Sequence, residues 1–124
     1  MKIRIQGNSI RYRLKQFEVE AFAEKGLLTE IISFGEEEQD QLRFILCTDS
    51  NDIFSLKKTA STIELSIPKT IAAKWVNSDS VGFEERVRAN KGKEINILVE
   101  KDFKCLTRSD EEEAGSYPNP MKQC

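Results

Sequence analysis

Apolar and polar side chains alternate in two short runs at the start of the chain, residues 2–6 and 10–14. A period of two is typical of strands that bury one face. Gly7-Asn8 separates the two runs, and glycine at the first central position favours a type II′ turn. The pattern therefore predicts a tight antiparallel hairpin.

The spacing then becomes helical, because Val19, Phe22 and Ala23 recur on one side of residues 15–25 and Gly26 stands where a helix would end. Residues 28–34 and 42–47 predict two further strands, with an acidic loop at 35–41 between them. A second helix is predicted from about Pro68 to Val76, since proline is tolerated in a first helical turn. We interpret Trp75 in this helix as a core anchor.

The second half follows the apolar pattern of the first when it is displaced by 53 residues. The positions of Ile3, Ile10, Tyr12 and Leu14 are then taken by Leu56, Ile63, Leu65 and Ile67, that of Leu28 by Val81, and those of Val19 and Phe22 by Ala72 and Trp75. The match is one of patterns, with few identities. It raises the hypothesis of two ββαββ repeats, residues 1–53 and 54–106, related by a pseudo-two-fold axis.

These elements predict an α+β fold with an antiparallel, curved sheet or a partly closed barrel of about eight strands and two helices. Curvature or a second subunit is suggested by Ile45 and Leu98, which give the strands near them apolar groups on both faces. Residues 1–106 are expected to form one domain. Residues 107–124 lose all periodicity and gather acids before Pro118 and Pro120, which predicts an irregular acidic tail.

The composition excludes several functions. The chain has 124 residues, no histidine and a net charge of -2. Without histidine, Ser-His or Cys-His hydrolysis is excluded and the commonest zinc ligand is missing, so we expect neither a metal nor another cofactor. The charge balance argues against nucleic-acid binding.

The location is predicted from features that the sequence lacks. No signal peptide or apolar run long enough for a membrane span is present. Three distant cysteines without a CxxC pair fit reduced thiols. We therefore expect a cytoplasmic protein that makes no contact with a membrane.

The chemistry of interest lies in the predicted hairpin. A two-residue turn pairs Ile5 with Ile10 on one face, and Arg4 with Arg11 and Lys2 with Arg13 on the other. Like charges that face each other across strands destabilise a sheet, so a negative group is expected over them. Arginine forks bind phosphate or carboxylate through two parallel bonds. Lys2, Arg4, Arg11 and Arg13 are therefore the candidate site for an anionic small molecule or an acidic partner.

Two alternatives remain for these cations. Internal carboxylates could neutralise them, and candidates in or beside predicted strands are Glu30, Glu64, Glu85, Glu94 and Glu100. They could also belong to a metal-dependent phosphohydrolase of the triphosphate-tunnel kind, with a tunnel lined by Arg11, Arg13, Arg43, Lys57, Glu64 and Glu100. The Glu-x-Glu-x-Lys opening strand of that group is replaced here by Lys2-Ile3-Arg4.

A third interpretation is a structural or interaction protein that forms a homodimer through its second apolar sheet face, so a monomer and a homodimer both remain open. We expect a binding module more than an enzyme, and no catalytic residues are assigned.

The segments KIRIQGNSIRYRL, LLTEIISFG and EKDFKCL, the last followed by acids and YPNP, resemble a family of small bacterial proteins with a domain of unknown function. The similarity spans nearly the whole chain. It implies a bacterial, cytosolic, free-standing domain, and it places Arg4, Arg11 and Arg13 in the most recognisable segment. The family carries no assigned activity, so the resemblance transfers no catalytic residues.

Overall fold

The computed structural model describes residues 1–90 and 92–103 of the chain. In this part lie two α-helices and eight strands, as the sequence predicts. One 3-10 turn (η1, Glu38–Asp40) lies within the segment predicted as an acidic loop. The elements are β1 (Lys2–Gln6), β2 (Ser9–Leu14), α1 (Gln16–Lys25), β3 (Leu27–Ser33), β4 (Gln41–Asp49), β5 (Ser55–Lys58), β6 (Thr62–Pro68), α2 (Lys69–Val76), β7 (Gly82–Arg88) and β8 (Glu94–Lys101). The predicted tail, residues 107–124, lies outside the described residues.

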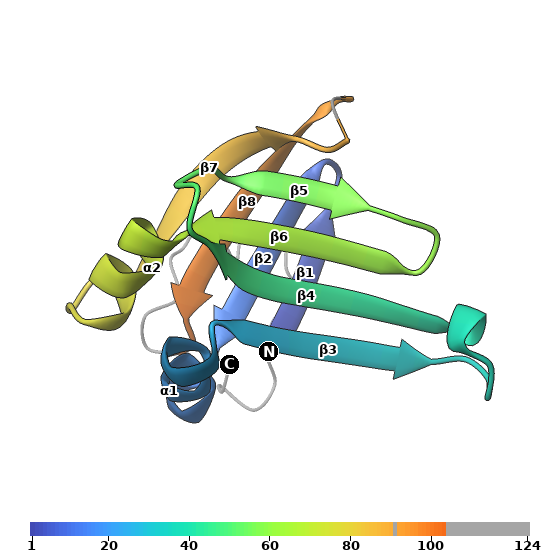
Figure 1. The fold of residues 1–124 in the computed structure, drawn as a ribbon, viewed down its shortest axis with the longest axis horizontal. Helices are drawn as coiled ribbons and strands as arrows, with labels where there is room; N and C mark the ends of the chain where they lie inside the picture. Colours follow the sequence, from blue (N-terminus) through green and yellow to red (C-terminus); the bar gives the residue numbers. More distant parts are fainter. Residues whose placement is uncertain (91, 104–124) are drawn as a thin grey trace, which may run out of the picture.

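The strands form two separate four-stranded sheets, with the order β1-β2-β8-β7 in the first sheet and β3-β4-β6-β5 in the second sheet. The sheets cross one behind the other, and both helices lie at one end of them (Figure 1). The α+β class is confirmed, but the sheets are not closed into a barrel. The expectation of antiparallel strands alone is wrong, because β2 pairs with β8 and β4 with β6 in parallel.

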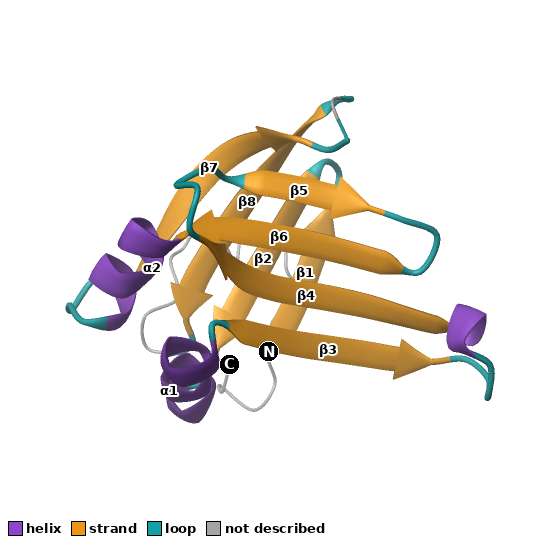
Figure 2. Cartoon of the chain, viewed as in Figure 1, coloured by secondary structure: helices purple, strands orange, loops and turns teal. Residues whose placement is uncertain are grey.

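The parallel pairs follow from the path of the chain. Each half begins with a hairpin, continues through a helix and ends with a second hairpin that joins the other sheet (Figure 2). A hairpin pairs its own strands antiparallel, whereas a parallel pair needs a connection of about a dozen residues or more. Residues 50–61, which contain β5, connect β4 to β6, and most of the described chain lies between β2 and β8. Alternation along a strand reveals which residues are buried but not which distant strand lies beside it.

The core lies between the sheets and under the helices. Tyr12, Leu46, Leu65, Ile97 and Val99 are fully buried there and come from all four central strands. Trp75 of α2 is buried as expected. Its ring contacts Phe22 of α1 and Phe83 of β7 edge-to-face, at centroid distances of 6.5 and 5.6 Å, and its indole N–H donates to the Val81 carbonyl oxygen at 3.0 Å. This side chain therefore holds both helices to the end of the first sheet.

The first hairpin has the predicted register, with Ile5 opposite Ile10 and Gln6 opposite Ser9. Gly7 has a φ of 56°, whereas Asn8 is not among the residues of positive φ. Positive φ at the first central residue alone is the pattern of a type II′ turn, in which glycine costs no steric strain. The turn at Gly7 thus positions the strands that carry the candidate cations.

The halves of the chain use matching registers. Ile10 pairs with Ile97 in the first sheet, and Ile63 pairs with Phe44 in the second. Ile63 follows Ile10 by 53 residues, and Ile97 follows Phe44 by the same number. The helices begin with the same displacement, at Gln16 and Lys69. Equivalent positions in the two central strand pairs therefore have equivalent neighbours.

The third strand of each half departs from this displacement. Leu28 pairs with Leu46, whereas Phe83 pairs with Val99, so Phe83 and not Val81 takes the place of Leu28. Gly26 ends α1 in the left-handed conformation and leads directly into β3, while five residues, 77–81, connect α2 to β7. Val81 lies in that longer connection, where it is 52% exposed. Because it precedes β7, the predicted equivalence of Val81 and Leu28 is wrong.

No helix among the described residues is long and apolar enough to cross a membrane.

Candidate functional site

The register of the first hairpin brings the four predicted cations together. Lys2 lies opposite Arg13, and Arg4 lies opposite Arg11. Tyr12 and Leu14 alternate with Arg11 and Arg13 along β2 and are fully buried, so alternation places the cations on the outer face of the first sheet. We call these four residues the basic cluster.

Two carboxylates of the described chain lie against the basic cluster. Glu100 pairs with Arg13 across β2 and β8, and its Oε1 atom accepts hydrogen bonds from Arg11 Nε at 2.6 Å and Arg13 Nε at 2.8 Å. Asp102 Oδ2 lies 3.4 Å from Lys2 Nζ. Glu100 is one of the glutamates that the sequence offered as internal partners, so internal neutralisation accounts for part of the charge.

Arg4 differs from its neighbours. It is exposed, and no hydrogen bond or ion pair joins it to another described residue. Arg11 and Arg13 are half-buried and have further contacts besides Glu100, so neither of them is free. Arg4 is therefore the most accessible cation of the basic cluster.

The residues proposed for a phosphate tunnel do not surround one space. Arg11, Arg13 and Glu100 lie on the outer face of the first sheet. Lys57 pairs with Glu64 on the second sheet, where Arg43 alternates with buried Phe44, so these three lie on that sheet's outer face. The two groups are separated by the core, because the sheets face each other through their buried sides.

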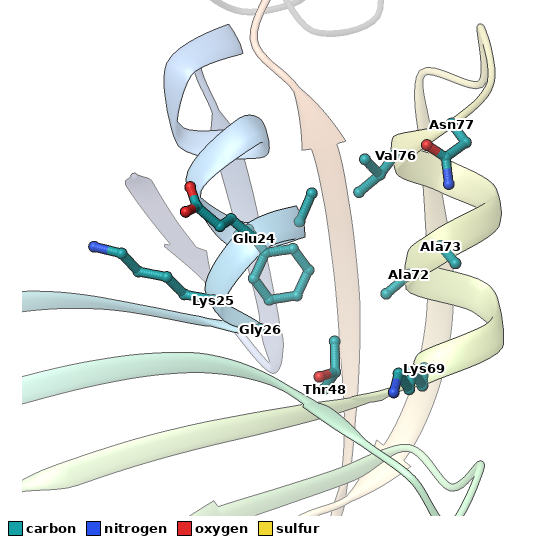
Figure 3. A pocket seen from close by; sticks show the side chains of 11 residues that line it. Glu24, Lys25, Gly26, Thr48, Lys69, Ala72, Ala73, Val76 and Asn77 are labelled. Carbon is teal, nitrogen blue, oxygen red and sulfur yellow. The ribbon is translucent and has the colours of Figure 1, made fainter.

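A pocket that the sequence did not suggest lies between the helices. Its volume is about 480 Å³, and its apolar wall is formed by Phe22, Ala23, Ala72, Ala73 and Val76. Thr48 and Lys69 lie at one end and Asn77 at the other (Figure 3). Three of the wall residues are alanines, whose short side chains leave this volume. Small residues on both helices were the available signal, but they reveal a pocket only once the helices are known to face each other.

A larger pocket of about 870 Å³ lies on another side of α1, toward the end of β8. Its polar lining is mainly acidic, with Glu20, Glu24, Asp79 and Asp102 beside Lys101. Such a lining does not favour the anionic ligands for which the basic cluster is suited. Among residues 1–90 and 92–103 there is also no group of three His, Cys, Asp or Glu side chains that could hold a metal ion.

Comparison with known families shows to which family the chain belongs. Residues 1–121 match the model of the Family of unknown function (DUF7009). The chain belongs to this family. No curated protein and no solved structure matches this DUF7009 chain.

One thiol of the DUF7009 chain lies on the outer face of the second sheet. Cys47 Sγ is 3.3 Å from Ser66 Oγ and 3.7 Å from Glu64 Oε1. Burial raises the pKa of the Cys47 thiol, and the nearby Glu64 carboxylate raises it further against the opposing effect of Ser66. Cys47 is therefore held as a thiol. Cys105 and Cys124 lie outside the described residues.

Apart from the basic cluster, the DUF7009 chain has a second set of paired charges at its amino terminus. The Met1 amino group contacts the Glu18 carboxylate of α1 and lies 2.7 Å from Glu30 Oε1 of β3. Burial lowers the pKa of this amine, but the two carboxylates outweigh burial and raise it. The pKa of Glu18 is lowered because hydrogen bonds from Met1 and the Lys15 backbone outweigh its own burial. These contacts fasten the first strand to the second sheet.

Proposed function

We propose that this protein is a binding module whose basic cluster holds a small phosphate-containing anion. The observation that carries the proposal is the stack of four cations on one rigid hairpin face against two carboxylates, Glu100 and Asp102. Arginine matches a phosphate with two parallel hydrogen bonds. The exposed guanidinium of Arg4 provides the attraction, and the strand pairing provides fixed spacing.

The residues have different parts in this proposal. Arg4, which is exposed, makes the first contact with the ligand, and Lys2 on the same strand adds a second cation beside it. Glu100 fixes the orientation of Arg11 and Arg13 through their Nε atoms, so these two contribute mainly a positive field. Binding by Arg4 does not require that either of the other arginines lose a partner.

Calorimetric titration with tripolyphosphate at low ionic strength tests the proposal. We expect Arg4→Glu to abolish binding, and Arg88→Glu to leave most of it. Arg88 is a matched control because it is an exposed arginine of the same sheet, on β7 at the opposite edge. Equal losses in both variants would show only a general charge effect and would contradict the proposal.

Hydrolysis can be measured with the same protein. Release of orthophosphate from tripolyphosphate in the presence of Mg²⁺ or Mn²⁺ would indicate an enzyme, whereas binding without release is the outcome expected for a binding module. The separation of the tunnel residues onto two sheet faces supports the binding module.

We also propose that residues 1–53 and 54–106 are diverged copies of one ββαββ unit. The shared displacement of 53 residues in helix starts and in the central strand registers supports this origin. An alignment of family members tests it: positions displaced by 53 should resemble each other more than positions at neighbouring displacements. A bacterial, cytoplasmic setting follows from the family resemblance, and cell fractionation of a bacterial source would test it.

A further inference from the structure

Strand β3 lies at the free edge of the second sheet, since β4 is its only partner among the described strands (Figure 1). The Gly26 carbonyl oxygen accepts from Thr48 N–H, and the Phe34 N–H donates to the Asp40 carbonyl oxygen. Because backbone groups alternate in direction along a strand, even-numbered residues bond toward β4. The N–H and C=O groups of Leu27, Thr29, Ile31 and Ser33 therefore point toward the free edge.

Edge strands usually carry charges that prevent pairing with another chain. Strand β3 has one charge, Glu30, and that carboxylate is already paired with the Met1 amino group. Its large apolar side chains are exposed together with Phe34 just beyond it: Leu27 48%, Ile31 48%, Ile32 51% and Phe34 75%. The other three edge strands each carry two or more charges: KIRIQ in β1, SLKK in β5 and GFEERVR in β7.

We propose that β3 pairs antiparallel with β3 of a second copy of this chain, with Ile31 opposite the partner's Ile31. A strand paired with itself in this way gives a closed two-fold dimer, in which each copy offers the same surface. The second sheets of the two copies then join into one continuous sheet through their β3 strands. This interface lies on the other sheet from the basic cluster, so it does not depend on anion binding.

The register follows from the side chains. Pairing centred on Ile31 places Glu30 opposite the partner's Ile32, and Leu28 opposite the partner's Phe34. The neighbouring register with the same parity, which pairs Leu27 with the partner's Ser33, is centred on Glu30 and sets two carboxylates directly against each other. Like charges in opposed positions destabilise and apolar pairs stabilise, so the pairing at Ile31 is favoured.

Charges at the two ends of the strand favour the same occupant. Lys25 precedes β3 and is exposed, and Glu36-Glu37-Glu38 follow it and are exposed. In the antiparallel register the end of each β3 that follows Lys25 lies beside the end of the partner's β3 that precedes these three glutamates. A second copy of the chain thus supplies the complementary charge at both ends of the interface, which an arbitrary apolar peptide would not.

Sedimentation equilibrium of the full chain, from about 1 µM to about 500 µM, tests the dimer. We expect a monomer–dimer equilibrium that Ile31→Lys weakens at least about tenfold, because it opposes two lysines at the two-fold axis. Ile53→Lys is the matched control: Ile53 is 59% exposed and lies in a connection away from β3. This variant is expected to dimerise like the parent.

Two further variants examine the charges. Lys25→Glu is expected to weaken the dimer, and Lys25→Glu combined with Glu37→Lys is expected to restore it. Circular dichroism confirms that each variant is folded.

Disulfide formation tests the register in a chain whose native cysteines are replaced by serine. Residues opposed in a hydrogen-bonded antiparallel pair have Cα atoms about 5.5 Å apart, within the range of a disulfide. Ile31→Cys should therefore give a cross-linked dimer on oxidation. Thr29→Cys should not, since four residues along the strand, about 13 Å, separate the two copies of Thr29.

A monomer throughout the concentration range would overturn the proposal. A dimer that Ile31→Lys and Ile53→Lys affect equally, or one that cross-links through Thr29→Cys and not through Ile31→Cys, would also overturn it. Loss of tripolyphosphate binding in an Arg4→Glu protein that still dimerises would concern the basic cluster alone.

Discussion

The two sheets of this protein have equivalent strand pairings but different outer surfaces. In the first sheet Arg11 and Arg13 flank Glu100. The positions displaced by 53 residues in the second sheet are Glu64 and Ser66, beside Cys47. A backbone that accepts either set of side chains does not itself require a cluster of arginines. The arginines of the first sheet are therefore a property of its own side chains and not a requirement of the shared backbone.

The two sheets also differ in the charge of their edge strands, β3 in the second sheet and β7 in the first. β3 and β7 each have seven residues, follow a helix and pair antiparallel with the next strand. β7 carries Glu84, Glu85, Arg86 and Arg88, whereas β3 carries Glu30 alone. The fold tolerates a charged strand at this position, so the apolar surface of β3 is not required for folding. Each sheet thus has one unusual surface, a basic face on the first and an apolar edge on the second.

The largest effect is expected where the halves meet, at the equivalent pair Phe22 and Trp75. Trp75→Ala should lower the free energy of unfolding by about 3–5 kcal/mol, through the cavity and the lost packing. We expect a smaller loss from Phe22→Ala, because Trp75 also contacts Phe83 and donates to the Val81 carbonyl. Urea unfolding measures both. Equal losses would show that the two halves contribute alike.

The next effect distinguishes the outer faces. Glu100→Gln removes the charge between Arg11 and Arg13 and should cost about 1.5–3 kcal/mol of stability, the range for hydrogen bonds to charged groups. The same variant should bind tripolyphosphate more tightly, since a competing carboxylate is gone. Cys47→Ala at the equivalent position should change anion binding little. Weaker binding in Glu100→Gln would contradict the assignment of the basic cluster.

The raised pKa of Cys47, which occupies the position equivalent to Glu100, should be visible in its rate of alkylation. Burial and the Glu64 carboxylate raise the pKa of Cys47, so its thiolate fraction, and with it the rate of reaction, should rise only at higher pH than for an exposed cysteine. Glu64→Gln removes the charge and should shift the rate profile to lower pH. Iodoacetamide labelling read by peptide mass spectrometry follows Cys47 alone. An unchanged profile would show that Glu64 does not contribute and would leave burial and the Asp49 carboxylate as the causes of the raised pKa.

The smallest effect concerns another equivalent pair, Tyr12 and Leu65, both fully buried. The Tyr12 hydroxyl is buried without a hydrogen-bond partner among the described residues, and burial raises its pKa. Tyr12→Phe removes an unpaired polar group and should leave stability unchanged or raise it by up to about 1 kcal/mol. Thermal unfolding measures the difference. A clear loss of stability would indicate that the hydroxyl has a partner.

Local features of the fold could be predicted from the sequence. The hairpin turn at Gly7, its register and both helices follow from alternation, helical spacing and the glycine and proline signals, which act over a few residues. The direction of the central pairs could not be predicted, because β2 and β8 come from opposite ends of the described chain. Two separate sheets were missed for the same reason.

The candidate site could likewise be predicted only where it depends on residues that are close together in the sequence. The four cations could be placed on one face because one hairpin carries them all. Glu100 was one of five candidate glutamates, and its choice depends on the parallel pairing of β2 with β8. Residues of β3 could be predicted as a strand, but its edge position depends on the order of the whole sheet. The pocket between the helices arises from alanines that are distant in the sequence, so the small residues on each helix reveal it only once the packing of the helices is known.

The exchange of strands between the halves has a consequence for synthesis on the ribosome. Strand β2 is central in its sheet, yet one of its two neighbours, β8, is among the last strands to emerge. Until then the first hairpin has a bare inner edge, and Tyr12 lacks the side chains that will surround it. Folding of the domain should therefore wait until β8 has left the ribosome, and until then cellular chaperones would meet an unfolded segment that includes both halves.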